Sequence, residues 1–195
     1  VNRELGIRQS SLKAARDISA ELIRSGIQTI VFAPSRTRVE LLLTYLRDSL
    51  RNKPGDPERV TGYRGGYLPN ERRAVEKGLR DGTVRGVVAT NALELGIDIG
   101  GLGASVVTGY PGSLASLWQQ FGRAGRSREA ALSVLVASSN PLDQFVATHP
   151  DFVFEGAVER GLIDPDNLFV MASHVKCAAF ELPFTVGEVF GANTD

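Results

Sequence analysis

The sequence predicts an α/β fold in which a parallel β-sheet carries helices on both faces, followed by a small helical appendage. Short apolar runs rich in β-branched residues alternate along the chain with longer segments whose apolar residues recur every three or four positions. The first pattern is typical of strands buried on both faces, and the second is typical of amphipathic helices. No hairpin dipeptide joins one apolar run directly to the next, so we expect right-handed crossovers between parallel strands.

The first three elements follow from local signals. Apolar residues at helical spacing lie between Ser10 and Gly26, and a glycine after the last apolar position is a common helix stop. Residues 28–33 form a β-branched run that ends before a proline, which predicts the first strand. Ser35 is a suitable cap for a second helix, which the segment 53–57 would end. The predicted buried side of this helix consists of Val39, Leu42, Leu43, Leu46 and Leu50.

Further strands and helices complete the predicted sheet. Apolar runs predict strands at residues 60–63, 86–90, 105–108 and 131–136. A helix is expected from Pro69 to Gly82, because a proline and an acidic residue in the first turn suit a helix start. Its predicted core side consists of Ala74, Val75 and Leu79. Another helix is expected to start near Ser113.

The pattern changes after residue 140. Helical pieces are expected near residues 142–148, 151–160 and 166–180, with prolines between them and no clear strand. We therefore expect one domain at residues 1–140. Residues 141–195 would form a helical appendage or the start of a further accessory domain.

Length and composition are those of a soluble globular protein. A chain of 195 residues that is 43% hydrophobic and 23% charged can bury a sizeable core. No run approaches the roughly 18 apolar residues of a membrane span, and the first residues do not resemble a signal peptide. Cys177 is the only cysteine and cannot form an internal disulfide, so we expect a cytoplasmic protein. One cysteine and two histidines also predict no metal site.

Charge is distributed unevenly along the chain. Residues 1–130 carry 20 Lys and Arg against 13 Asp and Glu, whereas residues 131–195 carry 2 against 9. Eighteen of the 22 basic residues are arginine. Phosphates are attracted to an arginine-rich region and repelled by an acidic one, so any polyanion path should lie on the first two-thirds. A solvated surface with an accidental asymmetry is the alternative.

The most distinctive stretch runs from Trp118 to Arg126 and reads W-Q-Q-F-G-R-A-G-R. Residues three apart share one face of a helix, so Arg123 and Arg126 are predicted to point the same way, with Gln119 one turn earlier. Guanidinium groups match phosphate oxygens, and the glycine before each arginine allows a ligand to approach closely. A solvated basic helix end is the alternative, although two glycines suit an ordinary helix poorly.

This stretch resembles motif VI of superfamily-2 helicases, Q-x-x-G-R-x-G-R. The resemblance implies that Arg123 and Arg126 are catalytic arginine fingers and that Gln119 contacts ATP. Residues 89–99 resemble motif V of the same helicases, which implies that Gly96 and Asp98 approach the bound nucleotide. A carboxylate is a good acceptor for ribose hydroxyl groups.

Candidate phosphate contacts follow three of the predicted strands. They are Ser35, Arg36, Arg64, Gly65, Gly66, Thr90 and Asn91. Ligands of open parallel sheets gather at the carboxyl ends of strands, where hydroxyl, guanidinium and backbone N–H groups can meet phosphates. Taken one at a time, Ser35 is explained by a helix cap, Arg36 by a solvated side chain, and Gly65 and Gly66 by a turn. Their order matches the nucleic-acid-contacting motifs of the family, except that many relatives carry histidine at the position of Arg64.

The resemblance covers about residues 12–138 and describes the second RecA-like lobe, which has a three-layer fold. Residues 173–184 are similar to the H-x-x-C-A-A-x-E-x-P segment of RecQ-like bacterial helicases of the YprA or SftH type. The family implies an ATP-dependent DNA helicase of 3′→5′ polarity. Its partners would be single-stranded DNA, ATP and an N-terminal RecA-like lobe. His174 and Cys177 are expected to pack rather than to bind zinc.

Two expected nucleotide-binding motifs are missing. The chain has no G-x-x-x-x-G-K-[ST] loop and no Asp-Glu pair at a strand end. ATP and Mg²⁺ would therefore be held mainly by the N-terminal lobe, and this chain alone is predicted not to hydrolyse ATP. An RNA helicase, a translocase that separates no strands and a nucleotide-independent nucleic-acid-binding module stay open as alternatives. A Rossmann enzyme is disfavoured because no G-x-G-x-x-G follows a strand.

Overall fold

The computed structural model describes residues 9–51, 57–94, 102–125, 130–159, 161, 164 and 167–190. The chain separates into two compact units, Val1–Glu159 and Arg160–Asp195. The first unit contains the sheet, and the second contains the helix α7 (Leu168–Glu181). This division falls later in the chain than the expected boundary between residues 140 and 141, because two helices beyond residue 140 pack with the sheet.

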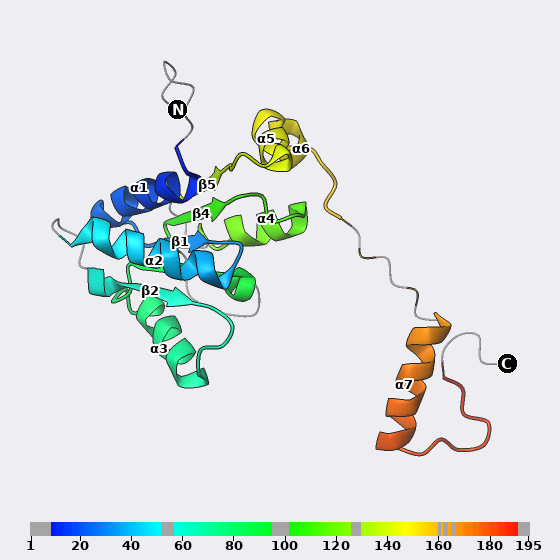
Figure 1. Ribbon diagram of the computed structural model, residues 1–195. Coiled ribbons are helices and arrows are strands. Elements are labelled where there is room, and N and C mark those ends of the chain that lie inside the picture. Colours follow the sequence, from blue (N-terminus) through cyan, green and yellow to red (C-terminus); the bar gives the residue numbers. More distant parts are fainter. Residues whose placement is uncertain are drawn as a thin grey trace. The chain divides into compact units, whose positions relative to one another are not determined.

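The sheet has five parallel strands in the order β2-β3-β1-β4-β5 (Figure 1). The strands are β1 (Thr29–Phe32), β2 (Val60–Tyr63), β3 (Gly86–Ala89), β4 (Ala104–Thr108) and β5 (Leu132–Val136). All five lie where the sequence predicts a strand. The central strand β1 pairs with β3 and β4, so that Val31 lies between Val88 and Val106.

Helices cover both faces of the sheet, which confirms the predicted three-layer α/β fold. One face carries α1 (Ser11–Arg24) and α2 (Arg36–Leu50), and the other carries α3 (Pro69–Arg80) and α4 (Leu114–Phe121). Neighbouring residues of β1 point to opposite faces, so Val31 joins the core under α1 and α2, whereas Ile30 and Phe32 join the other core. The central strands are therefore buried on both sides.

The predicted buried side of α2 is confirmed at all five positions. On α3, Val75 and Leu79 are buried as expected, but Ala74 is exposed, so its predicted place in the core is wrong. The spacing of apolar residues places Ala74 at the margin of the apolar face of α3, and in the structure this position faces solvent. The short helices η1 (Pro57–Arg59) and η2 (Asn91–Leu93) lie between the main elements.

Two short helices extend the first unit beyond the sheet. They are α5 (Pro141–Thr148) and α6 (Pro150–Phe154). Val146 and Val153 belong to the same hydrophobic core as α3 and α4, which is why these helices are part of the first unit. The helix expected near residues 151–160 ends earlier, at Phe154.

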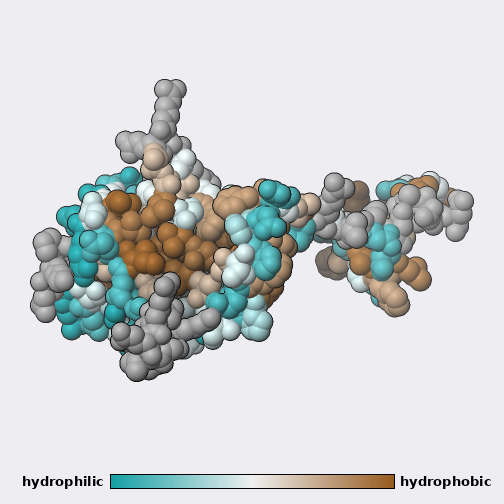
Figure 2. Space-filling view, turned by 90° about the horizontal axis from the view of Figure 1, so that it is seen from above, coloured by the Kyte–Doolittle hydropathy of each residue, from teal (hydrophilic) through white to brown (hydrophobic). Residues whose placement is uncertain are grey.

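The surface of the first unit contains a broad hydrophobic area in the view from above (Figure 2). The edge strand β5 is only partly covered, and Leu132 keeps 46% of its surface exposed. In the second unit, α7 has no buried residue, and Phe169 and Phe180 are exposed at 86% and 91%. Of the helices in the described ranges, none has both the length and the hydrophobicity needed to cross a membrane.

Candidate nucleic-acid and nucleotide interface

The carboxyl ends of β2, β3 and β1 meet at one edge of the sheet. The backbone N–H of Ala33 donates to the carbonyl of Ala89 at 2.8 Å, and the N–H of Thr90 donates to the carbonyl of Tyr63 at 3.3 Å. These bonds join the loops that follow the three strands. The sheet therefore brings together the three segments in which the sequence predicts phosphate contacts.

Ser35 and Arg36 begin the helix α2. The hydroxyl of Ser35 accepts a hydrogen bond from the backbone N–H of Arg38 at 3.3 Å, so Ser35 is the predicted helix cap. The guanidinium of Arg36 lies against the backbone of Gly65, because a Cβ at position 65 would be 3.3 Å from its Nη2 atom. Arg36 and Gly65 are thus neighbours across the strand β3, although 29 positions separate them in the numbering.

Arg64 is held by contacts on several sides. Its Nε donates to Oε1 of Glu40 at 2.6 Å, and its Nη1 donates to the carbonyl of Gly65 at 3.3 Å. Its guanidinium carbon lies 5.0 Å from the centre of the Tyr67 ring. The hydrogen bond and charge of Glu40 raise the pKa of the Arg64 guanidinium above its ordinary value. Arg64 therefore stays a fixed cation at the sheet edge.

Thr90 and Asn91 follow the strand β3. The hydroxyl of Thr90 accepts a hydrogen bond from the N–H of Ala92 at 3.4 Å and begins the short helix η2. Thr90 is half-buried, whereas Asn91 is exposed and lines a small cavity. A hydroxyl that accepts one bond can still donate another, so Thr90 keeps a donor for a phosphate oxygen.

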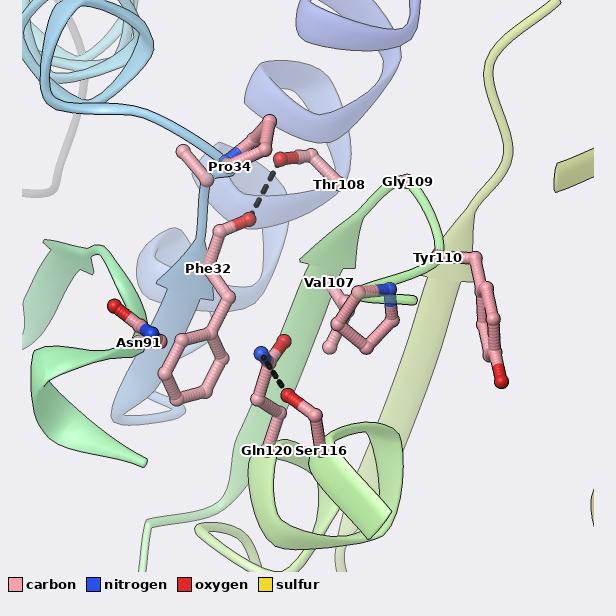
Figure 3. A pocket seen from close by; sticks show the side chains of 11 residues that line it. Phe32, Pro34, Asn91, Val107, Thr108, Gly109, Tyr110, Ser116 and Gln120 are labelled. Carbon is pink, nitrogen blue, oxygen red and sulfur yellow. Dashed lines mark hydrogen bonds between the residues drawn. The ribbon is translucent and has the colours of Figure 1, made fainter. Parts of the chain in front are cut away.

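The cavity beside Asn91 has a volume of about 210 Å³ (Figure 3). It is lined by Phe32, Ala33, Pro34, Asn91, Val107, Thr108, Gly109, Tyr110, Pro111, Ser116 and Gln120. The hydroxyl of Thr108 donates to the carbonyl of Phe32 at 2.6 Å, which ties the ends of β4 and β1 together. Polar groups from the strand ends and from α4 therefore face one small space at this edge.

A buried polar network joins the loop after β3 to the helix α4. Oε2 of Glu94 accepts hydrogen bonds from the Ser116 hydroxyl at 2.8 Å and from Nε2 of Gln120 at 2.9 Å. Glu94 is 8% exposed and Gln120 is 5% exposed. Sequence patterns alone do not predict these residues as site components. A usable signal is the place of Glu94, an acidic residue between two leucines five positions after the end of the buried strand β3.

The chain leaves the helix α4 before it reaches the arginines. Helix α4 ends at Phe121, and Gly122 closes it with an N–H bond to the carbonyl of Trp118 at 2.8 Å. Gly125 has a φ of +85° and donates to the carbonyl of Leu102 at 3.0 Å. A residue with this φ ends a helical path, and glycine adopts it without strain. Gln119 and Arg123 therefore do not share a face of one continuous helix, because the helix ends between them.

Arg123 lies beyond the helix end and is buried, with 7% of its surface exposed. Gln119 lies in the last turn of α4 and is half-buried. The glycine before each arginine predicts that a ligand can approach closely, and the burial of Arg123 does not fit that prediction. Gly96, Asp98 and Arg126 lie outside the described residues, so their predicted positions at the nucleotide cannot be compared with the structure.

A carboxylate also lies at the start of α4. Both oxygens of Glu159 accept hydrogen bonds, one from the N–H of Leu114 at 2.7 Å and one from the N–H of Ala115 at 3.0 Å. These two bonds lower the pKa of Glu159. The residue that ends the first compact unit thus stabilises the helix that precedes Arg123.

The described residues provide no magnesium site. No group of three or more His, Cys, Asp or Glu side chains is arranged to hold a metal ion in the described ranges. The chemistry of the described strand ends is that of anion recognition, with guanidinium, amide and hydroxyl donors.

Comparisons with known proteins identify the family of this chain. Residues 13–128 match the family model described as the helicase conserved C-terminal domain. The uncharacterized ATP-dependent helicase YprA of Bacillus subtilis is 50% identical over 98% of this chain and 26% of its own length. The chain therefore spans about a quarter of the length of this relative.

Solved structures show the same fold in larger proteins. The helicase MrfA, in a crystal structure bound to DNA and AMPPNP, is 49% identical and matches 98% of this chain and 26% of its own chain with a TM-score of 0.89. The helicase Lhr of Mycobacterium smegmatis, bound to ssDNA and AMP-PNP, is 28% identical and matches 93% of this chain and 24% of its own with a TM-score of 0.78. Because the family match covers more than half of the chain, this chain belongs to the helicase conserved C-terminal domain family and is the second RecA-like lobe of a superfamily-2 helicase.

Proposed function

We propose that this chain is the C-terminal motor lobe of an ATP-dependent DNA helicase that moves 3′→5′ along single-stranded DNA. The observation that carries the proposal is the meeting of the β1, β2 and β3 ends, where Arg36 and Arg64 flank Gly65. Two guanidinium groups beside one turn suit a sequence-independent contact with phosphates. The likeness to MrfA, which is bound to DNA, supports DNA as the strand.

The strand path would cross the three neighbouring loops. Its proposed contacts are Ser35, Arg36, Arg64, Gly65, Gly66, Thr90 and Asn91. Nucleic acid that meets backbone and basic side chains is held without base recognition, which a motor needs in order to move along any sequence. Binding should therefore weaken steeply as the salt concentration rises.

The nucleotide side of the proposal rests on the motif at residues 119–126. We assign ATP contacts to Gln119, Gly96 and Asp98, and stabilisation of the transferred phosphate to Arg126 and Arg123. Only 7% of Arg123 is exposed, so we assign the direct contact to Arg126 and a supporting charge to Arg123. A buried guanidinium lies in a water-poor environment, where its charge acts more strongly on charge that develops on the phosphate.

The proposal places the rest of the ATP machinery on an N-terminal RecA-like lobe. That lobe would bind the triphosphate and Mg²⁺, and closure of the two lobes would bring Arg126 to the nucleotide. This chain alone would then hydrolyse no ATP, and the protein would act in the cytoplasm. We also propose that residues 160–195 begin an accessory region, because α7 has no buried residue.

The test uses the full-length protein with Arg126→Ala. An arginine finger is worth about 10³–10⁵ in turnover, so ATP hydrolysis should fall by about a thousandfold or more while single-stranded DNA binding stays nearly intact. Arg128→Ala removes a nearby arginine outside the repeated G-R pattern and serves as the control. Loss of DNA binding with normal ATP hydrolysis in Arg126→Ala would contradict the proposal.

The same preparation separates the alternative functions. A helicase of the proposed type unwinds DNA duplexes that carry a 3′ tail, and it does so better than RNA duplexes or 5′-tailed ones. Equal unwinding of RNA would indicate an RNA helicase, and ATP hydrolysis without unwinding would indicate a translocase. Tight binding of single strands by this chain alone, with no need of the N-terminal lobe, would favour a nucleotide-independent binding module.

A further inference from the structure

We propose that Glu40 is a positioning residue for the nucleic-acid strand, because it holds the guanidinium of Arg64 beside that of Arg36 so that both meet one phosphate. The inference rests on the proposed function and adds to it a residue that touches no nucleic acid itself. Glu40 is an acidic side chain next to a predicted polyanion path. Its charge alone would weaken DNA binding, so its place there needs another explanation.

The helix α2 supplies two side chains to the same loop. Arg36 and Glu40 are four residues apart, so they lie on one face of the helix, one turn apart. Arg36 contacts the backbone of Gly65, and Oε1 of Glu40 accepts the bond from Nε of Arg64 at 2.6 Å. One helix face therefore sets the positions of both guanidinium groups.

Glycine at position 65 makes this arrangement possible. A Cβ there would lie 3.3 Å from Nη2 of Arg36, which is closer than ordinary side chains pack. The carbonyl of the same residue accepts a hydrogen bond from Nη1 of Arg64 at 3.3 Å. Gly65 is thus the point at which the two arginines come together, with Arg36 against its Cα and Arg64 on its carbonyl.

Tyr67 supports Arg64 from the other side. Its hydroxyl lies against Gly62 in the strand β2, where a Cβ would be only 2.7 Å away. Its ring then lies under the Arg64 guanidinium at 5.0 Å, a distance at which a cation is attracted to an aromatic face. Because Gly62 has no side chain, Tyr67 can pack closely against the strand β2. Carboxylate, carbonyl and ring together leave the guanidinium little freedom.

These contacts leave donors for a ligand. A guanidinium has five N–H donors, and the bonds to Glu40 and Gly65 use two of them. Nη2 of Arg64 has no hydrogen-bond partner among the described residues. Arg64 is 27% exposed and Glu40 is 47% exposed in their side chains, so solvent reaches the pair. The end of the guanidinium that carries the Nη atoms can therefore bind phosphate while Glu40 keeps Nε.

This geometry distinguishes positioning from competition. A carboxylate that occupied both Nη atoms would have to leave before a phosphate could bind them. Glu40 instead contacts Nε, at the inner end of the guanidinium. Glu40 can therefore stay in place when DNA is bound. The conformational entropy of the Arg64 side chain is then lost when the protein folds, so less of it is lost on DNA binding.

The experiment measures single-stranded DNA binding by the full-length protein at several salt concentrations. Glu40→Ala should weaken binding about three- to tenfold, because the guanidinium of Arg64 loses the acceptor that holds its Nε and residues of one hydrogen-bonded network are coupled. Glu40→Gln keeps an oxygen that accepts from Nε, so it should bind as tightly as the unchanged protein or slightly more tightly. Asp48→Ala removes a carboxylate that pairs with Arg51 on the same helix, and should change nothing.

A double-mutant comparison identifies the residue through which Glu40 acts. Arg64→Ala and Arg36→Ala should each weaken binding, and each lost phosphate contact lowers the salt slope by about 0.7 on single strands. In the Arg64→Ala protein, adding Glu40→Ala should not weaken DNA binding further. In the Arg36→Ala protein, adding Glu40→Ala should weaken DNA binding by the same factor as in the unchanged protein. Thermal melting of every variant shows whether it is folded at the temperature of the binding assay.

Two results would contradict the proposed role of Glu40 but leave the proposed function intact. Tighter binding by both Glu40→Ala and Glu40→Gln would show that Glu40 competes with phosphate. Unchanged binding by Glu40→Ala, with a clear loss in Arg64→Ala, would show that Glu40 has only a structural role. Unchanged binding by both Arg36→Ala and Arg64→Ala would instead refute the strand path of the proposed function, and the inference with it.

Discussion

The carboxylate of Asp143 accepts a hydrogen bond from the backbone N–H of Tyr110 at 3.0 Å. Its other oxygen accepts from the backbone N–H of Ser138 at 2.8 Å. Asp143 lies in the first turn of α5 and is 6% exposed, whereas Tyr110 follows β4 and lines the cavity at the sheet edge. One buried carboxylate thus fixes the loops that leave the last two strands.

Replacing Asp143 should destabilise the first unit. Asp143→Ala leaves two half-buried backbone N–H groups without their acceptor, which should cost about 1–3 kcal/mol in total because water can reach them in part. Urea unfolding of the 195-residue chain measures the change. Asp151→Ala, which removes an exposed acid from the first turn of α6, is the matched control and should lie within about 0.5 kcal/mol of the unchanged chain. Equal effects of the two substitutions would show that the Asp143 bonds contribute little.

The effect of Asp143 should also depend on pH. Burial raises the pKa of this carboxyl, but the hydrogen bonds from Ser138 and Tyr110 outweigh burial and lower the pKa below its ordinary value of 3.8. A carboxyl with a lowered pKa in the folded state stabilises the protein above pH 3.8 and loses this effect as pH falls through the folded-state value. The stability difference between the unchanged chain and Asp143→Asn should therefore be constant near neutral pH and shrink below about pH 4. A difference that grows under acid would contradict this assignment.

The two adjacent glutamines should behave differently. Gln120→Ala removes a donor from the buried carboxylate of Glu94 and should lower the free energy of unfolding by about 1–3 kcal/mol. Gln119→Ala changes a half-buried side chain and should cost about 0.5 kcal/mol or less. Chemical unfolding of both variants under the same conditions checks the contrast. The opposite order would mean that the network of Glu94, Ser116 and Gln120 does not stabilise the fold.

Substitutions of the adjacent glycines 65 and 66 should separate an effect on DNA binding from an effect on stability. Gly65→Ala brings a methyl group within 3.3 Å of the mobile end of Arg36, so stability should change little, while single-stranded DNA binding by the full-length protein weakens as Arg36 moves. Gly66 has a φ of +99°, so Gly66→Ala forces an unfavourable backbone conformation and should cost about 1 kcal/mol or more. Paired thermal melting and DNA-binding measurements test the prediction. A large stability loss at position 65 would refute it.

Local sequence patterns are sufficient to predict the secondary-structure elements of this protein and their order. β-Branched runs marked all five strands, and helical spacing marked the buried side of α2. Ser35 was identified as a cap from its place between a strand and a helix. These features depend on interactions within a few residues, so local patterns are enough to reveal them. Motif order also indicated the family, because the family's chemistry needs particular residue types in sequence.

Only the tertiary structure decided which residues meet and where the site helix ends. The strand order β2-β3-β1-β4-β5 brought Arg36, Arg64 and Gly65 together, and paired Glu40 with Arg64 across 24 positions. The end of α4 at Phe121 separated Arg123 from the helical face that its spacing from Gln119 suggested. Such contacts depend on how the chain returns to the same place after a crossover. The residues next to a position in sequence do not indicate which side chain that position will contact after the crossover. The packing of the whole sheet determines this contact.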